Sequence, residues 1–212
     1  MPVSELELVL TERLEQHLAP LNFEKTPHLK QFRRACKGGY QCIVLSLAGQ
    51  HPLEIEIFLG VRLDLVEELV YQFTMGLREY RPHSTTLLTP AKKVTEKAEL
   101  RYELHQESDV EKVGNDIKEF MLTYGYDFLD QYNGVSALDQ LYNANPEQKA
   151  DYITNEYHRA LRGVILAKLV QSQSWPELVQ FYQRKLEKKG TPEVQLNKYL
   201  RLVEFLKNHS FN

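Results

Sequence analysis

The sequence predicts an α+β fold in which an antiparallel sheet with flanking helices is followed by a C-terminal antiparallel helical bundle. Two observations on the apolar residues indicate this. From residue 29 to residue 106, most apolar residues occur in short runs or alternate with polar ones, which is typical of strands. From Ser108 onward, the spacing of the apolar residues becomes helical and stays helical.

The N-terminal segment is predicted to be a helix from Ser4 to about Leu18, because leucines at four-residue spacing form one apolar stripe. A set of strands follows, and glycine-containing turns separate them, which predicts an antiparallel meander. The predicted strands are Leu29–Cys36, Tyr40–Ala48 and Leu53–Val61.

A second helix is predicted to begin at Asp64, where Glu67 completes the spacing of a capping box. Two weaker strands, His83–Leu88 and Leu100–Gln106, follow this helix. The polar segment Thr89–Glu99 between them is expected to be an exposed loop or the tip of a hairpin.

The C-terminal half is predicted to consist of helices joined by short loops. The first begins at Ser108, and Gly125 is expected to end it. Further helices are expected to open at Asn145, Ser174 and Thr191, because each lies just before a proline in the first helical turn. Short loops predict that neighbouring helices run antiparallel.

These elements suggest a sheet lobe at residues 1–107 and a helical half at residues 108–212 that packs on it. Gly163 falls inside a predicted helix, where glycine costs about 1 kcal/mol relative to alanine. A close approach by another backbone would explain this glycine. We therefore expect an interface between the two parts at Tyr157, Arg159, Arg162 and Gly163.

The composition is that of a folded protein, with 42% hydrophobic and 26% charged residues. The net charge of −3 does not favour a protein that coats nucleic acid. No apolar run approaches the ~20 residues that span a bilayer, and the N-terminus lacks the pattern of a signal peptide. The two cysteines, Cys36 and Cys42, are expected to be free thiols in the cytoplasm.

No motif in the chain carries a recognisable chemistry. The seven histidines lack the spacing of a local metal site, and neither a phosphate-binding glycine loop nor a Gly-x-Ser-x-Gly elbow occurs. Glu54 and Glu56 would leave one face of a strand about 7 Å apart. That spacing suits a two-carboxylate site, but it equally suits the solvated face of a sheet. We assign no catalytic, cofactor or metal residue.

A basic segment precedes the turn at Gly38 and has one aromatic residue in its middle. It can be interpreted as a surface for RNA, single-stranded DNA or an acidic protein. It can equally be a charged edge strand whose cations discourage pairing with other sheets, which we favour because the net charge is negative. The residues of this possible binding surface are Lys25, Lys30, Phe32, Arg33, Arg34 and Lys37.

Short segments of the N-terminal two-thirds resemble the uncharacterised DUF4304 family. The similar features are an opening helix that ends in Leu18–Phe23, a basic strand with Phe32-Arg33, and a strand that leads into Phe58–Val61. The tryptophan that the family pattern places after the sheet has no counterpart, because Trp175 is the only tryptophan. The resemblance implies a binding role, similar to that of accessory or toxin-immunity proteins, and no activity.

The sequence therefore favours a non-catalytic binding protein whose partner is another protein. The alternatives are an enzyme with a site at the interface between sheet and helices, and a weak nucleic-acid binder that uses Lys25–Lys37. We expect no cofactor, no metal and no membrane association, and the sequence does not indicate an oligomeric state.

The absence of a linker between the two parts predicts that they unfold as one cooperative unit. Thermal unfolding followed by two independent probes should then give coincident transitions. Two well-separated transitions would contradict this expectation.

Overall fold

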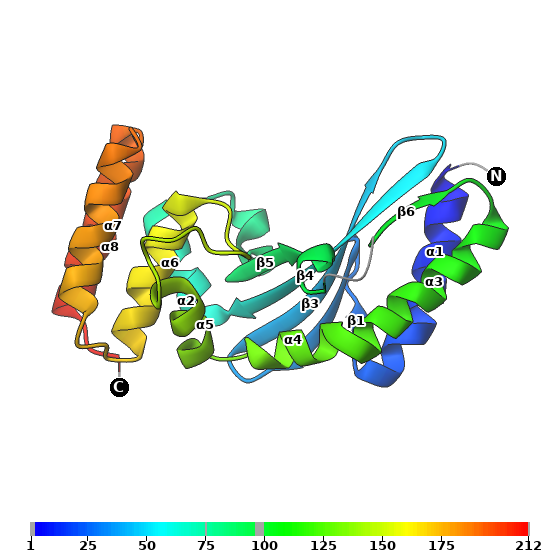
Figure 1. The fold of residues 1–212 in the computed structure, drawn as a ribbon, viewed down its shortest axis with the longest axis horizontal. Coiled ribbons are helices and arrows are strands. Elements are labelled where there is room, and N and C mark those ends of the chain that lie inside the picture. The colour runs from blue at the N-terminus through cyan, green and yellow to red at the C-terminus, as the bar shows by residue number, and fades with distance from the viewer. Residues whose placement is uncertain (1–2, 75, 96–99, 212) are drawn as a thin grey trace. The chain divides into compact units, whose positions relative to one another are not determined.

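The structure is a computed structural model that describes residues 3–74, 76–95 and 100–211. Within these residues it has the predicted α+β architecture (Figure 1). A six-stranded sheet has the order β1-β2-β3-β4-β5, and β6 also pairs with β4. The strands are β1 (Glu24–Lys25), β2 (Gln31–Cys36), β3 (Gly39–Ala48), β4 (Leu53–Leu63), β5 (Leu87–Pro90) and β6 (Arg101–Leu104).

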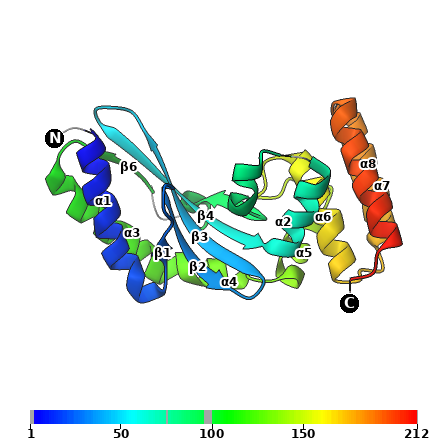
Figure 2. The same ribbon diagram turned by 180° about the vertical axis from the view of Figure 1, so that it is seen from behind.

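The α-helices lie before, between and after these strands. Figure 1 and Figure 2 show α7 and α8 side by side at the C-terminal end, where they contact each other. None of the described helices is both long and apolar enough to cross a membrane. The helices are α1 (Val3–Leu18), α2 (Asp64–Thr74), α3 (Glu107–Phe120), α4 (Tyr126–Gln131), α5 (Val135–Asn143), α6 (Glu156–Leu169), α7 (Trp175–Lys188) and α8 (Glu193–Asn208).

Contacts within the chain group it into two compact units. Unit 1 comprises Met1–Val61 and Leu88–Gln131, and unit 2 comprises Arg62–Leu87 and Tyr132–Asn212. These bounds differ from the expected division between residues 107 and 108, because α3 packs on α1 and α2 packs on α6 and α8. A single unfolding transition stays a prediction.

The core of unit 1 follows the predicted apolar patterns. The α1 leucines at positions 6, 10, 14 and 18 are fully buried, and so are alternate residues of β4. The hairpin turns around Gly38 and Gly49 occur as expected, since both glycines have the positive φ that favours this residue. The predicted patterns therefore place α1, β3 and β4 correctly.

The segment around β5 differs from the prediction. Residues Arg78–His83 form a short 3₁₀-helix, η2, and the strand begins later, at Leu87. Thr89 is fully buried, so the expected exposed loop Thr89–Glu99 is wrong at its start. Its last part, residues 96–99, lies outside the described residues.

The helical segments also depart from the prediction in two places. Gly125 does not end the helix that begins with α3, because the chain continues through a π-helical turn, Met121–Gly125, into α4. A Cβ atom on Gly125 would lie 2.5 Å from Met121 Sδ, so the absence of a side chain allows this turn. The helix expected from Asn145 begins only at Glu156, and α5 before it was not predicted.

A buried arginine explains why no helix begins at Asn145. Arg159 of α6 is 1% exposed. Its guanidinium donates to the carbonyl oxygens of Tyr142 at 2.8 Å, Asn145 at 3.1 Å and Gln148 at 2.6 Å. The Tyr142 carbonyl lies in the last turn of α5, where the helix dipole is negative, and the other two carbonyls belong to the segment after this helix. The chain after α5 is therefore arranged around the cation and not in a further helix.

Tight packing surrounds Gly163 on the same helix. Its carbonyl oxygen accepts a hydrogen bond from Asn143 Nδ2 at 2.9 Å, and the Tyr182 hydroxyl donates to Asn143 Oδ1 at 2.9 Å. The indole of Trp175 donates to the carbonyl oxygen of Val164 at 2.9 Å and ties α7 to α6. These contacts hold α5, α6 and α7 together within unit 2.

We predict that Gly163→Ala destabilises the protein. The added Cβ would lie 2.7 Å from Asn143 Oδ1 and 3.0 Å from the Tyr182 ring, and both side chains are held by hydrogen bonds. Overpacking of this kind costs ~1–3 kcal/mol, which exceeds the gain in helix propensity of about 1 kcal/mol. Urea unfolding should show a net loss of up to about 2 kcal/mol.

Gly114→Ala is the matched control. There an added Cβ would lie 2.8 Å from Arg13 Cγ, so this side chain must shift, but it is half-exposed and its ion pair with Glu111 lies at the surface. We expect a smaller loss than for Gly163→Ala, because the gain in helix propensity offsets the shift of an exposed side chain. Equal losses at both glycines would contradict the role of Asn143 and Tyr182.

Candidate functional site

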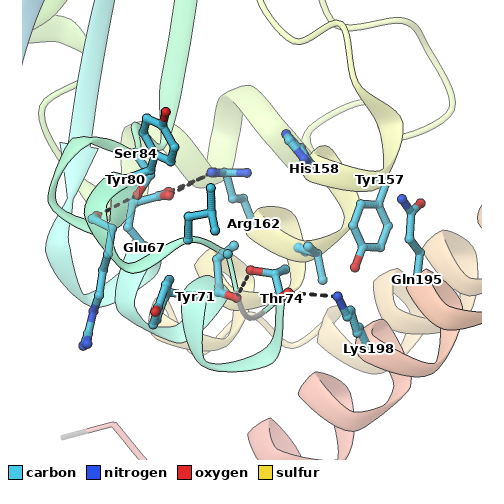
Figure 3. Close-up of a pocket in the computed structure, with 15 residues that line it drawn as sticks. Glu67, Tyr71, Thr74, Tyr80, Ser84, Tyr157, His158, Arg162, Gln195 and Lys198 are labelled. Carbon is cyan, nitrogen blue, oxygen red and sulfur yellow. Dashed lines mark hydrogen bonds and ion pairs between the residues drawn. The ribbon is translucent and has the colours of Figure 1, made fainter.

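Unit 2 contains a pocket of about 250 Å³ between α2, η2, α6 and the start of α8 (Figure 3). Apolar side chains of Val70, Leu77 and Leu161 form part of its wall. Aromatic rings of Tyr71, Tyr80 and Tyr157 also line it. Unit 2 has two larger hollows, of about 460 and 510 Å³, which lie beside Trp175 and along α7 and α8. Their described lining residues include no buried polar atom that lacks a hydrogen-bond partner.

A buried ion pair stands at one side of this pocket. Glu67 of α2 is 2% exposed and Arg162 of α6 is 8% exposed. The guanidinium donates through Nε to Oε1 at 2.9 Å and through Nη2 to Oε2 at 2.8 Å. This bidentate geometry offsets much of the cost of removing both charges from water. The pair therefore fixes α2 against α6.

Arg62, at the end of β4, holds the segment that forms the pocket rim. Its side chain is buried and donates to Asp64 at 2.6 Å and to the carbonyl oxygens of Arg81 and Ser84 at 3.0 and 2.9 Å. Arg81 pairs in turn with Glu68, and this hydrogen bond lowers the pKa of the Glu68 carboxyl. The rim is therefore fixed by interactions that begin at Arg62.

The opposite wall presents Tyr157, His158, Gln195 and Lys198 (Figure 3). Lys198 Nζ donates to the carbonyl oxygen of Thr74 at 2.8 Å. The buried Tyr157 hydroxyl has no hydrogen-bond partner among the described residues, and burial raises its pKa. Desolvation, with a smaller effect of Arg162, lowers the pKa of His158, so its imidazole is neutral at physiological pH.

The residues expected at a lobe interface have their contacts inside unit 2. Arg162 pairs with Glu67, which the sequence had placed in the sheet lobe. Arg159 and Gly163 contact residues at the end of α5, and Tyr157 lines the pocket. The atoms nearest to Gly163 belong to the side chains of Asn143 and Tyr182 and not to another backbone, which the sequence had led us to expect.

Part of the basic segment Lys25–Lys37 lies inside unit 1. Phe32 is 1% exposed and Arg34 is 8% exposed. Arg34 donates to Asp130 at 2.5 Å and to Gln41 Oε1 at 2.6 Å, and its guanidinium lies 3.8 Å from the centre of the Tyr126 ring. The expected surface is therefore corrected at these positions, since a buried ring cannot stack on a base and a buried guanidinium cannot reach a phosphate.

The remaining cations of the segment differ in their surroundings. Arg33 lies 4.0 Å over the Tyr40 ring, and Lys30 pairs with Glu7 at 2.9 Å. The two lysines at the ends of the segment, Lys25 and Lys37, are exposed. The segment thus lacks the accessible aromatic ring and continuous cationic groove of single-strand binders.

The carboxylates and cysteines considered from sequence lie apart from the pocket. Glu54 pairs with Arg101, and Glu56 pairs with Lys92 at 3.1 Å, on the strand surface of unit 1. Cys42 is buried, which raises the pKa of its thiol to about 11. Among the described residues, no group of three or more His, Cys, Asp and Glu side chains is placed to hold a metal ion.

The sequence interpretation missed most of the pocket. Glu67 was interpreted as a capping residue, and Lys198 and Gln195 had no motif around them. One feature of the sequence could have indicated the buried ion pair beside the pocket. Glu67 lies on the apolar face of α2, between Val66 and Val70, and a carboxylate in that position needs a buried cation.

Comparison with models of protein families, with curated proteins and with solved structures finds no match for this chain. The resemblance to the DUF4304 family therefore stays a prediction, and the function has to be argued from the geometry of the pocket.

We predict that Arg162→Met destabilises the protein by about 3–5 kcal/mol, because it leaves the Glu67 carboxylate buried without its partner. The double variant Glu67→Leu/Arg162→Met should recover most of this loss, since it buries no unpaired charge. Urea unfolding of both variants and of Glu67→Leu completes a double-mutant cycle. Additive losses would show that the ion pair does not couple α2 to α6.

Proposed function

We propose that the protein is a non-catalytic binding protein and that the pocket of unit 2 is its ligand site. One observation carries the proposal: the carboxylate and the two guanidinium groups that line the pocket are already paired with fixed charged partners. Both oxygens of Glu67 accept from Arg162, whereas a general base needs a lone pair within reach of the substrate proton. Such an arrangement favours recognition over proton transfer.

His158 is the group on which a catalytic reading would depend. Among the described residues, no carboxylate or hydroxyl group is bonded to its ring, so none of them orients it as the base of a nucleophile–base pair. The rigid rim held by Arg62 reduces the entropy lost when a ligand binds. Both features support binding as the function.

A protein partner is the second candidate. Leu77 and Tyr80 at the pocket rim are 66% and 62% exposed. Exposed apolar and aromatic side chains next to a pocket are typical of interaction surfaces. We also propose a cytoplasmic location, which the absence of a disulfide at Cys36 and Cys42 supports.

Purification from a native lysate tests the binding function. Denaturing the purified protein should release a small molecule at near-stoichiometric amount, which mass spectrometry identifies. Gln195→Trp should abolish its retention, because Gln195 lines the pocket and an indole there fills it. Asn197→Trp, at an exposed position of α8 outside the lining, should retain it.

The other outcomes separate the alternatives. A stoichiometric protein that is lost on Tyr80→Asp would favour the second candidate. Conversion of the retained molecule during incubation would show an enzyme. Equal retention by Gln195→Trp and the wild type would contradict a ligand site in this pocket.

A further inference from the structure

We infer that the pocket of unit 2 binds a small carboxylate whose body is apolar. The inference rests on the proposed function and names the class of ligand. Three features of the pocket support it: one cation without a carboxylate partner, one buried hydroxyl without a partner, and an apolar wall.

The cation is Lys198. Arg162 and Arg81 also line the pocket, but carboxylates of Glu67 and Glu68 already neutralise them. Lys198 Nζ donates to the carbonyl oxygen of Thr74, and no carboxylate pairs with it in the described part of the chain. The pocket therefore carries one positive charge that is not compensated, which an anionic ligand would neutralise.

The hydroxyl is that of Tyr157. It is buried, and leaving it without a hydrogen bond destabilises the folded protein. Figure 3 shows the Tyr157 hydroxyl and the Lys198 amine directed into the same part of the pocket. A carboxylate offers two acceptor oxygens, so one can accept from the hydroxyl and the other from the ammonium. Such a ligand would satisfy both groups at once.

The body of the ligand is apolar because the remaining wall is apolar. Val70, Leu161 and the Tyr71 ring line the same pocket as the ion pair and Lys198. The volume of about 250 Å³ lies below the ~300–1,000 Å³ typical of pockets for drug-sized ligands. This size fits a small acid with a short aliphatic chain or one ring.

The available charge favours a carboxylate over a phosphate. Phosphate recognition commonly uses arginine forks or several backbone donors. Here both arginines are engaged by Glu67 and Glu68. A single lysine and a single hydroxyl match a singly charged anion.

A panel of matched probes tests the inference by isothermal titration at constant ionic strength. The panel contains phenylacetate and hexanoate as carboxylates, phenylacetamide as the neutral analogue, phenethylammonium as the cation and phenyl phosphate as the phosphate. We expect a carboxylate to bind and its amide analogue to bind at least 10-fold more weakly. Phenyl phosphate binding more tightly than the carboxylates would overturn the choice of carboxylate.

Variants locate the binding. Lys198→Met should weaken carboxylate binding about 10- to 100-fold, the range of a lost charge-assisted hydrogen bond. Tyr157→Phe should also weaken it, while raising the melting temperature of the ligand-free protein, because an unpaired buried hydroxyl has gone. Lys207→Met, an exposed α8 lysine paired with Glu204, is the control and should change neither.

The results distinguish this inference from the proposed function. If the amide or the cation binds tightly and Gln195→Trp abolishes this binding, the pocket remains a ligand site but the choice of a carboxylate as its ligand is overturned. Carboxylate binding that Lys198→Met leaves unchanged would overturn the assigned donors. If no probe binds, the carboxylate inference fails, and retention from lysate still decides the proposed function.

Discussion

Helix α6 is buried on all sides from Arg159 to Ala167, and the arrangement of unit 2 depends on this enclosure. An enclosed helix that carries two arginines must find every partner for them inside the protein, because an unpaired buried charge is very costly. Arg159 donates to carbonyl oxygens in the last turn of α5 and in the segment after it, and Arg162 donates to the carboxylate of Glu67. The positions of α2 and α5 around α6 follow from these two guanidinium groups.

The same enclosure explains where a ligand can be held. From its buried stretch, α6 lines the pocket only with Leu161 and with Arg162, which is already paired with Glu67, whereas its first turn contributes Tyr157 and His158. The start of α8 contributes Gln195 and Lys198 from the other side. The Tyr157 hydroxyl, which we propose as a ligand contact, therefore lies on a different turn of α6 from the ion-paired Arg162, and it has no hydrogen-bond partner among the described residues.

Sequence patterns predicted those parts of the fold that depend on residues close to one another in the sequence. The leucine stripe of α1 and the alternation in β4 have the period of their element, so their burial follows from the sequence. The pocket depends on pairs such as Glu67 and Arg162, which are 95 residues apart, and no spacing rule connects them. Arg34 and Asp130 are 96 residues apart, which is why the basic segment looked like a free surface. The start of α6 at Glu156 could not be predicted for the same reason. The segment before it is arranged by the hydrogen bonds of Arg159, which depend on tertiary packing and not on the proline after Asn145.

The anchored indole of Trp175 gives unit 2 an optical property. As the only tryptophan of the chain, it is half-buried, donates to Val164 and has the Lys168 ammonium 5.0 Å from its ring. Its fluorescence therefore comes from one environment, the junction of α6 and α7. Any loosening of α7 brings water to the indole and takes away both the carbonyl and the cation, so a shift of the emission would follow this junction without an attached label.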